Sequence, residues 1–438
     1  LTGEHRSSTS TRSDAFSDFK AGFEIRTTQR CEQIQIFTNP IEGEIKTRTY
    51  HFQYSDEILP EDERPYNGVS LLCKVEVEGH DCAVSEFLPP LEFRYTHFKP
   101  SQQKFKRIEG EQMPLASLAN PGFELIDMFG NGLPDIVQIE GVVRYWRNLG
   151  DGKFDIPRVM KDAPSGYSLG DPDVQLVDAN GNGRTDLLVN GAKLSGYFGM
   201  RHDGSWDTKA FKKYKYAPSF SFADPEVKML DLTGDGVTDV LRNGASFECF
   251  FQDKNNGWVE TKRIPKKQLE DFPNVSFADP RIKLADMSGD GLQDIVQVNS
   301  GSVKYWPNLG YGNFAKPVVM KNSPRFQFPV DLAKVQLADI DGDGLSDLIY
   351  VDTDKITFWI NQSGNGWSAP FEIAGTPFVT NLNGVRVADI YGNGTAGILY
   401  SFDAASSSQQ HRWYFLDLTG SVKPYLLHEM DNNMGSLT

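Results

Sequence analysis

Short apolar runs alternate with polar turns along most of this chain, and six of the turns share one composition. Each of the six follows the pattern D-x-x-G-[DN]-G-x-x-[DG] between apolar segments. They begin at Asp127, Asp178, Asp231, Asp286, Asp339 and Asp389. The spacing is about fifty residues, which is the length of a four-stranded propeller blade.

The fifth repeat shows how one unit is expected to fold. Its β-branched and aromatic runs predict strands at 335–340, 348–351, 356–360 and 367–373, with the acidic turn between the first two. The other repeats follow the same order, and VRYW at 143–146 is echoed by VKYW at 303–306. We therefore predict an all-β chain in which residues 102–430 form a six-bladed β-propeller. A β-solenoid is the rival architecture, but its rungs are much shorter than these repeats.

The region before the repeats has strand-like runs without the acidic turn. The runs are 22–37, 45–54, 69–77 and 91–98, and they predict a small antiparallel β region over residues 19–101. Residues 1–18 are rich in Ser, Thr and Arg and are expected to form a flexible segment, and 431–438 a tail. The sixth blade needs closing strands, for which 412–417, 425–430 and 105–108 are all candidates.

Composition narrows the functional classes. The 438 residues carry a net charge of −15, which argues against nucleic acid as a partner because phosphate binding needs clustered Lys and Arg. No apolar run is long enough to insert into a membrane. The chain begins with Leu1 and shows no signal peptide, so we expect a fragment of a longer protein. The four cysteines are too scattered for a disulfide framework and are expected to be reduced, although Cys73 and Cys82 could face each other across a hairpin.

The acidic turns predict structural calcium sites. Carboxylates crowded onto one short turn repel each other unless a cation lies among them, and calcium prefers oxygen ligands. The expected ligands are the side chains at positions 1, 3, 5 and 9 and the backbone carbonyl at position 7. Four turns offer a full set, so we expect up to four Ca²⁺ ions of modest affinity. The ligands are Asp178, Asn180, Asn182, Arg184 and Asp186; Asp231, Thr233, Asp235, Val237 and Asp239; Asp286, Ser288, Asp290, Leu292 and Asp294; and Asp339, Asp341, Asp343, Leu345 and Asp347.

The first and sixth turns break the ligand pattern. Phe129 occupies position 3 of the first turn, while the sixth has Tyr391 at position 3 and Gly397 at position 9. Both are expected to keep the turn and to lack the metal. The alternative for all six is a tight Gly/Asp turn without an ion.

Catalytic motifs are not found in the sequence. G-x-S-x-G, H-E-x-x-H and the phosphate-binding loop are absent, and the G-x-G-x-x-G match at 392–397 leads into a strand where a dinucleotide site needs a helix. The tryptophans at 146, 306 and 359 recur at one repeat position, where they either pack in the core or stack on sugars. We expect no enzyme, no catalytic residues and no cofactor besides calcium.

Several motifs resemble the B component of bacterial Tc (toxin complex) insecticidal toxins. Those similar to its SpvB-type region are DAF at 14–16, AGFEIRT at 21–27 and LPPLEF at 88–93. Those similar to its middle region are YWPNLGYGNF at 305–314, NQSGN at 361–365, KPYLL at 423–427 and NNMG at 432–435. The likeness covers nearly the whole chain in order, and the turns themselves are FG-GAP/VCBS-like.

The resemblance implies a secreted virulence protein whose propeller is a docking and gating module. In that family the B and C components form a shell, and the propeller docks on the pore-forming A component. The expected partners are therefore an A-type and a C-type component. The chain lacks most of the SpvB-type region and the later Rhs/YD-type repeats, so it cannot form the shell alone. A lectin-like propeller that binds glycans is the alternative.

Overall fold

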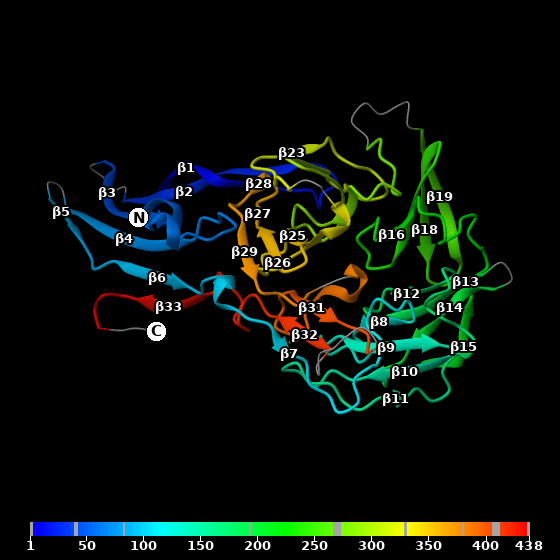
Figure 1. The fold of residues 1–438 in the computed structure, drawn as a ribbon. Helices are drawn as coiled ribbons and strands as arrows, with labels where there is room; N and C mark the ends of the chain where they lie inside the picture. Colours follow the sequence, from blue (N-terminus) through cyan, green and yellow to red (C-terminus); the bar gives the residue numbers. More distant parts are fainter. Residues whose placement is uncertain are drawn as a thin grey trace.

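The computed structural model describes residues 3–38, 43–81, 84–191, 194–265, 273–327, 331–378, 381–404 and 412–435. Within these ranges the chain is almost entirely β-structure, with α1 (Ser55–Ile58) as a single helical turn. Figure 1 shows a propeller with a separate twisted sheet beside it. The predicted fold class, a six-bladed propeller preceded by an antiparallel β region, is confirmed.

The described residues of the propeller form six antiparallel four-stranded sheets, one per blade. Blades one and two contain β8 (Phe123–Ile126), β9 (Asp135–Glu140), β10 (Val142–Trp146), β11 (Arg158–Val159), β12 (Val174–Val177), β13 (Asp186–Gly191), β14 (Leu194–Met200) and β15 (Trp206–Lys213). Blades three and four contain β16 (Val227–Leu230), β17 (Asp239–Asn243), β18 (Ser246–Asp253), β19 (Gly257–Pro265), β20 (Ile282–Ala285), β21 (Asp294–Asn299), β22 (Ser302–Trp306) and β23 (Val318–Met320).

The fifth blade corrects one strand assignment. It contains β24 (Val335–Ala338), β25 (Asp347–Val351), β26 (Lys355–Trp359) and β29 (Phe371–Ala374). The fourth strand therefore begins at Phe371, whereas a strand was predicted over 367–373. Trp367 lies instead in a small hairpin of β27 (Asn361–Gln362) and β28 (Gly366–Trp367), because the chain turns back before it reaches the sheet.

The sixth blade is completed by a strand from before the first blade. It contains β30 (Val385–Ala388), β31 (Gly397–Ser401), β32 (Trp413–Leu416) and β7 (Lys106–Arg107). Tyr414 pairs with Arg107 and Phe415 with Lys106, so the outer strand comes from the N-terminal side. Of the three candidates for ring closure, 412–417 and 105–108 thus lie in this blade. The third does not.

The separate sheet joins the two ends of the chain. Its path is β1 (Gly3–Asp18), β2 (Ile25–Thr38), β3 (Ile45–Tyr54), β4 (Leu72–Asp81), β6 (Leu91–Tyr95) and β33 (Leu427–Asp431), with β5 (Val84–Phe87) paired to β4. Two predictions are therefore wrong. Residues 3–18 form a long edge strand rather than a flexible segment, and residues 427–431 leave the propeller and pair with β6.

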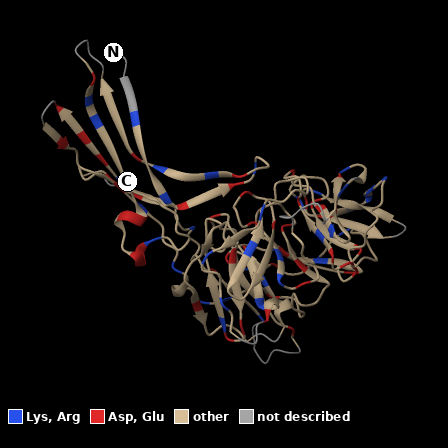
Figure 2. Cartoon of the chain, turned by 90° about the horizontal axis from the view of Figure 1, so that it is seen from above, with Lys and Arg blue, Asp and Glu red and all other residues tan. Residues whose placement is uncertain are grey.

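The core of the propeller lies between blades. One cluster joins Phe123, Ile136 and Trp146 of blade one to Trp413 and Phe415 of blade six, and so seals the ring. Cys31, Cys73 and Cys249 are free thiols, and the prediction for Cys82 lies outside the described residues. Within the described ranges, no helix is both long and apolar enough to cross a membrane. Figure 2 shows that basic and acidic residues are interspersed along the strands and loops of the propeller and of the sheet.

Candidate cation centre in the ring of acidic turns

All six acidic turns are built on the carboxylate at position 1. In each turn one oxygen of this aspartate accepts a hydrogen bond from the backbone N–H of the glycine at position 6, at 2.7 to 2.9 Å. The side chain at position 5 accepts from the N–H at position 7. These bonds are the same in turns with and without a full ligand set. The hydrogen-bond pattern of the turn therefore does not depend on a full set of ligand side chains.

In five of the six turns an aspartate at position 9 ties the turn to the third strand of its blade or to the residues just after that strand. Asp294 Oδ2 accepts from Met287 N at 3.0 Å, and Asp294 Oδ1 accepts from Asn308 N at 2.8 Å. The same pair of bonds is made by Asp135, Asp186, Asp239 and Asp347. All five side chains are buried. Position 9 thus has a packing role that is independent of any ion.

Neighbouring turns interlock into a closed ring. The glycine at position 4 of each turn lies against the side chain at position 7 of the next, and the sixth turn lies against the first. A side chain at Gly342 would meet Thr395 Cγ2 at 2.9 Å, and one at Gly392 would meet Leu133 Cδ2 at 2.8 Å. The other pairs are Gly130 with Arg184, Gly181 with Val237, Gly234 with Leu292, and Gly289 with Leu345.

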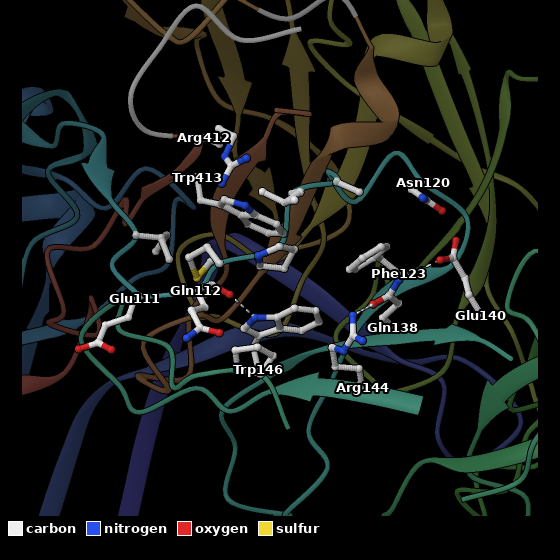
Figure 3. Close-up of a pocket in the computed structure, with 17 residues that line it drawn as sticks. Glu111, Gln112, Asn120, Phe123, Gln138, Glu140, Arg144, Trp146, Arg412 and Trp413 are labelled. Carbon is white, nitrogen blue, oxygen red and sulfur yellow. Dashed lines mark hydrogen bonds between the residues drawn. The ribbon is translucent and has the colours of Figure 1, made fainter. Parts of the chain in front are cut away.

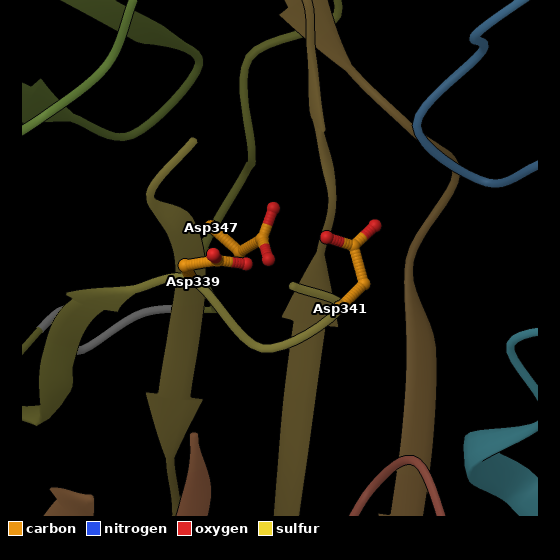
Figure 4. A group of neighbouring side chains, drawn as sticks. All are labelled: Asp339, Asp341 and Asp347. Carbon is orange, nitrogen blue, oxygen red and sulfur yellow. The ribbon is translucent and has the colours of Figure 1, made fainter. Parts of the chain in front are cut away.

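The fifth turn brings carboxylates together most closely. Asp339, Asp341 and Asp347 each offer an oxygen within 4.8 Å of the other two. Figure 4 shows the three side chains gathered at this turn. Burial raises the pKa of all three, and it raises the pKa of Asp343 to about 6. The neighbouring carboxylates add to the rise for Asp341 and Asp347. A divalent cation here would offset the cost of burying these carboxylates and the repulsion between Asp341 and Asp347 and their neighbours.

Residues from outside the propeller contact this same turn. Tyr425 Oη donates to Asp341 Oδ2 at 3.0 Å, and Asn67 Nδ2 donates to Asp343 Oδ2 at 2.9 Å. The side chain of Lys423 passes over Gly342. The other oxygen of Asp341 and of Asp343 faces the backbone of the turn itself. The sequence pattern did not identify these three contacts, because they come from irregular segments far away in the chain.

The fourth turn shows unsatisfied buried oxygens. Within the described part of the chain, neither Ser288 Oγ nor Asp290 Oδ2 has a hydrogen-bond partner, although both atoms are buried. Asp290 is 5% exposed, and burial raises its pKa together with those of Asp286 and Asp294. A buried oxygen without a donor is costly, and a cation at positions 1, 3, 5 and 9 would satisfy it. The residues of this turn therefore fit calcium.

The second and third turns are more open. In the second turn, Asn180 Nδ2 donates to Asp186 Oδ2, so an amide already occupies the carboxylate that a cation would use. In the third, Thr233 Oγ1 donates to Asp231 Oδ1 at 3.3 Å, and Asp235 is exposed. Among the described residues, only the fifth turn gathers three carboxylates within 4.8 Å. The structure thus ranks the predicted sites, with the fifth and fourth ahead of the other two.

Aromatic packing explains why the first and sixth turns depart from the ligand pattern. The Phe129 ring packs on Tyr145 at a centroid distance of 5.9 Å, with the guanidinium of Arg147 over it. Tyr391 packs on Phe415 at 4.8 Å. At Gly397 a side chain would collide with the Phe415 ring, which leaves no room for the usual aspartate. These two turns use position 3 for packing.

The recurrent tryptophans belong to the core. Trp146, Trp306 and Trp359 are 4%, 5% and 7% exposed, so they do not present repeated open faces for sugar stacking. Of the two uses expected from the sequence, packing is the one found.

Comparison with known proteins supports the resemblance seen in the sequence. Residues 286–350 match the FG-GAP-like repeat model, and residues 2–39 match the model of the Salmonella virulence plasmid 65kDa B protein. None of the curated proteins matches the chain significantly.

Solved toxin structures match almost the full chain. The Photorhabdus luminescens Tc holotoxin pore is 29% identical over 98% of this chain and 20% of that chain, with a TM-score of 0.82. The TcdB2–TccC3 structure is 28% identical over 98% and 20%, with a TM-score of 0.64. The complex of TcdB2–TccC3 with Cdc42 is 28% identical over 97% and 20%, with a TM-score of 0.65. The chain thus spans about a fifth of the length of these toxin chains, and the resemblance expected from the sequence is confirmed.

Proposed function

We propose that this chain is the docking and gating propeller of a B-component-like toxin protein and binds a pore-forming A-type partner. The observation that carries the proposal is the match to the Tc holotoxin pore, at 29% identity over 98% of the chain and a TM-score of 0.82. We propose a non-catalytic role, and the acidic cluster of the fifth turn is suited to a structural part in it, because Asp341 and Asp347 are 0% exposed. A substrate cannot reach these side chains.

A difference between the matches supports the gating part. Identity and coverage are nearly equal for the holotoxin pore and for TcdB2–TccC3, yet the TM-scores are 0.82 and 0.64. Because sequence divergence is nearly the same in the two matches, we take the gap as support for two conformations of the matched region. We propose that the propeller changes conformation when a pore-forming partner docks, and that this change opens the path through the toxin.

Docking should involve the face opposite the acidic turns. The face with the turns is partly covered over blade five, where Gln362 Nε2 donates to Tyr66 O at 3.1 Å and Asn365 Nδ2 donates to Ala15 O at 2.7 Å. The opposite face carries the turns between second and third strands. There, Val142 is 56% exposed at the start of β10.

Calcium in the fourth and fifth turns would stabilise this propeller. Asp286, Ser288, Asp290 and Asp294 would hold one ion, and Asp339, Asp341, Asp343 and Asp347 a second. Such an ion supplies positive charge that neutralises buried carboxylates. The protein side chains position the turn and tie it to its blade.

Binding of the 438-residue chain to an assembled A-type pore, measured by surface plasmon resonance, tests the proposal. Saturable binding is expected. Val142→Asp should weaken it, because a charge would enter the contact. Leu149→Asp is the matched control, since Leu149 is 58% exposed on the opposite face of the same blade. Absence of pore binding by the folded wild-type chain would overturn the function, and equal effects of the two variants would overturn the choice of face.

A further inference from the structure

A cavity of about 670 Å³ lies between the first and sixth blades. Figure 3 shows Trp146 and Trp413 on opposite sides of it, with Phe123, Gln138, Glu140 and Arg144 grouped at one end. Its volume falls within the range of about 300 to 1,000 Å³ that is typical of small-molecule sites.

The cavity results from the way the ring closes. Residues 108–117, here called the strap, run from β7 to the first blade and cross the junction of the two blades. Trp146 Nε1 donates to Gln112 O at 2.6 Å, and Ala404 N donates to Leu115 O at 2.9 Å. These bonds hold the strap to blade one and to blade six. Several residues of the strap line the cavity.

One wall of the cavity is polar and ordered. Arg144 and Gln138 are direct partners on β10 and β9, and Arg144 Nη1 donates to Gln138 Oε1 at 3.3 Å. Gln138 Nε2 donates to Glu140 Oε2 at 2.8 Å. No carboxylate of the described residues forms an ion pair with Arg144. The wall therefore offers guanidinium donors and a carboxylate oxygen, Glu140 Oε1, that no described residue engages.

Two tryptophans form the aromatic part of the cavity lining, on opposite sides of it. Trp413 is 2% exposed and Trp146 is 4% exposed, so each contributes an edge rather than an open face. Within the described ranges, Trp413 Nε1 has no acceptor, although the atom is buried beside the cavity. An unpaired buried donor is unfavourable, and a ligand oxygen beside Trp413 would accept a hydrogen bond from Nε1 after a small shift of the ring.

The corresponding position in blade four is used differently. There, Gln297, Lys304 and Trp306 take the places of Gln138, Arg144 and Trp146. The ammonium of Lys304 lies over the Trp306 ring, 4.8 Å from its centre. In blade one, Arg144 turns instead toward Gln138 and leaves the space beside Trp146 open. The repeat alone therefore does not require the cavity.

We propose that this cavity binds one hexopyranose unit of a glycan. A pyranose has several hydroxyls that both donate and accept, which suits a wall of amide, carboxylate and guanidinium groups, and the electropositive tryptophan edges can face its oxygens. A phosphate ligand suits it less, because Glu111 and Glu140 both line the cavity. A lipid chain suits it less because of the polar wall. This activity is separate from docking on a pore, and neither depends on the other.

Saturation-transfer NMR on the full chain tests the proposal, with glucose, galactose, N-acetylglucosamine, glucuronic acid and N-acetylneuraminic acid as probes. At least one sugar should receive saturation. Arg144→Met should weaken its binding about tenfold, the effect expected for loss of one charged hydrogen bond. Ala116→Phe, which places a ring in the cavity from the strap, should abolish binding. Lys304→Met is the matched control at the equivalent position of blade four and should change nothing.

Thermal melts verify that each variant is folded before its binding is measured. Absence of saturation transfer to every sugar probe by the folded wild-type chain would overturn the proposal. So would a sugar signal that persists in both Arg144→Met and Ala116→Phe. Pore binding measured on the same samples separates this result from the docking function.

Discussion

Tyr425 Oη donates a hydrogen bond to Asp341 Oδ2 at 3.0 Å, which connects the segment leaving the propeller to the most acidic turn within it. Asp341 is 0% exposed, so this phenol is one of the few donors available to its carboxylate. Asn67, which precedes the propeller in the sequence, makes the equivalent contact to Asp343. The fifth turn is therefore a joint between propeller and sheet as well as a candidate cation site.

Removing the phenol hydroxyl should weaken this joint. Tyr425→Phe leaves one oxygen of a buried carboxylate without its donor, and we expect a loss of about 1 to 3 kcal/mol in the free energy of unfolding without calcium. Urea titration followed by tryptophan fluorescence measures this. Tyr311→Phe is the control, because Tyr311 is 64% exposed. An equal effect of both changes would contradict the importance of the Tyr425 contact.

Calcium should raise the melting temperature of the chain. A site filled to a hundred times its dissociation constant adds about 2.7 kcal/mol, which differential scanning calorimetry resolves. Replacing Asp339 and Asp343 by Asn should reduce the calcium-dependent increment. Asp389→Asn alters position 1 of the sixth turn, which is not a predicted site, and should leave the increment unchanged. Identical melting in chelator and in saturating calcium would argue for turns without an ion.

Stability should depend on pH in the absence of calcium. Burial raises the pKa of Asp135 and Asp186 to about 6 and that of Asp239 to about 7, from an ordinary value of 3.8. The folded chain then binds more protons than the unfolded chain between about pH 4 and 7, so stability should fall as pH rises through this window. Carboxylates with a lowered pKa affect stability in a lower pH range. The pKa of Asp14 is about 2, so its contribution to stability is lost only as the pH falls below the ordinary value of 3.8.

Urea unfolding at intervals between about pH 4 and 8, in chelator and in calcium, measures this dependence. Calcium in the fourth and fifth turns favours the ionised carboxylates there, so it should reduce the part of the decline that Asp294, Asp341 and Asp347 contribute and leave the part from Asp135, Asp186 and Asp239. A stability that rises with pH in chelator would contradict the assignment of neutral buried carboxyls.

The carboxylate at position 9 should be essential for blade packing. Asp294→Ala leaves Met287 N and Asn308 N without an acceptor, and two unpaired buried N–H groups cost about 2 to 6 kcal/mol. Asp294→Asn keeps one side-chain oxygen and should cost less. Hydrogen exchange of these two amides, read by NMR, locates the effect. If both amides stay protected from exchange in Asp294→Ala, the turn is held to its blade by contacts other than those of Asp294.

The sixth turn should not tolerate a side chain at position 9. A Cβ at Gly397 would lie 2.3 Å from Phe415 Cζ and 2.5 Å from the carbonyl oxygen of Leu416, so Gly397→Ala should destabilise by about 1 to 3 kcal/mol. At Gly199 the nearest atom is 3.8 Å away, and Gly199→Ala serves as the control. Comparable melting temperatures for the two variants would contradict the packing described for Phe415.

Local sequence patterns were sufficient for the repeats and insufficient for what joins them. The acidic turn and the apolar runs around it recur in phase, so blades and loops could be predicted. Residues 3–18 were missed because an edge strand with Ser, Thr and Arg on both faces has no apolar alternation. The pairing of β33 with β6 was missed because it depends on contacts between the two ends of the chain, which local patterns do not encode.

The candidate sites show the same limit. The ligand positions of the turns could be enumerated, yet their ranking depends on how closely the carboxylates approach one another and on which buried oxygens lack a donor, which only the folded chain shows. The blade junction beneath the strap could not be anticipated, because residues 108–117 have neither helical nor strand periodicity.

The pairing of β6 with β33 also has a mechanical consequence. Leu427 lies opposite Tyr95 and Asp431 opposite Glu92, so the whole propeller is topologically an insertion between two adjacent strands of a hairpin. Tension along the polypeptide would act at the Glu92–Asp431 end of this pair and would have to open its hydrogen bonds one after another before it reached any blade. The propeller is thus insulated from forces that act on the rest of the chain, and it could be excised by joining the two strands through a short turn.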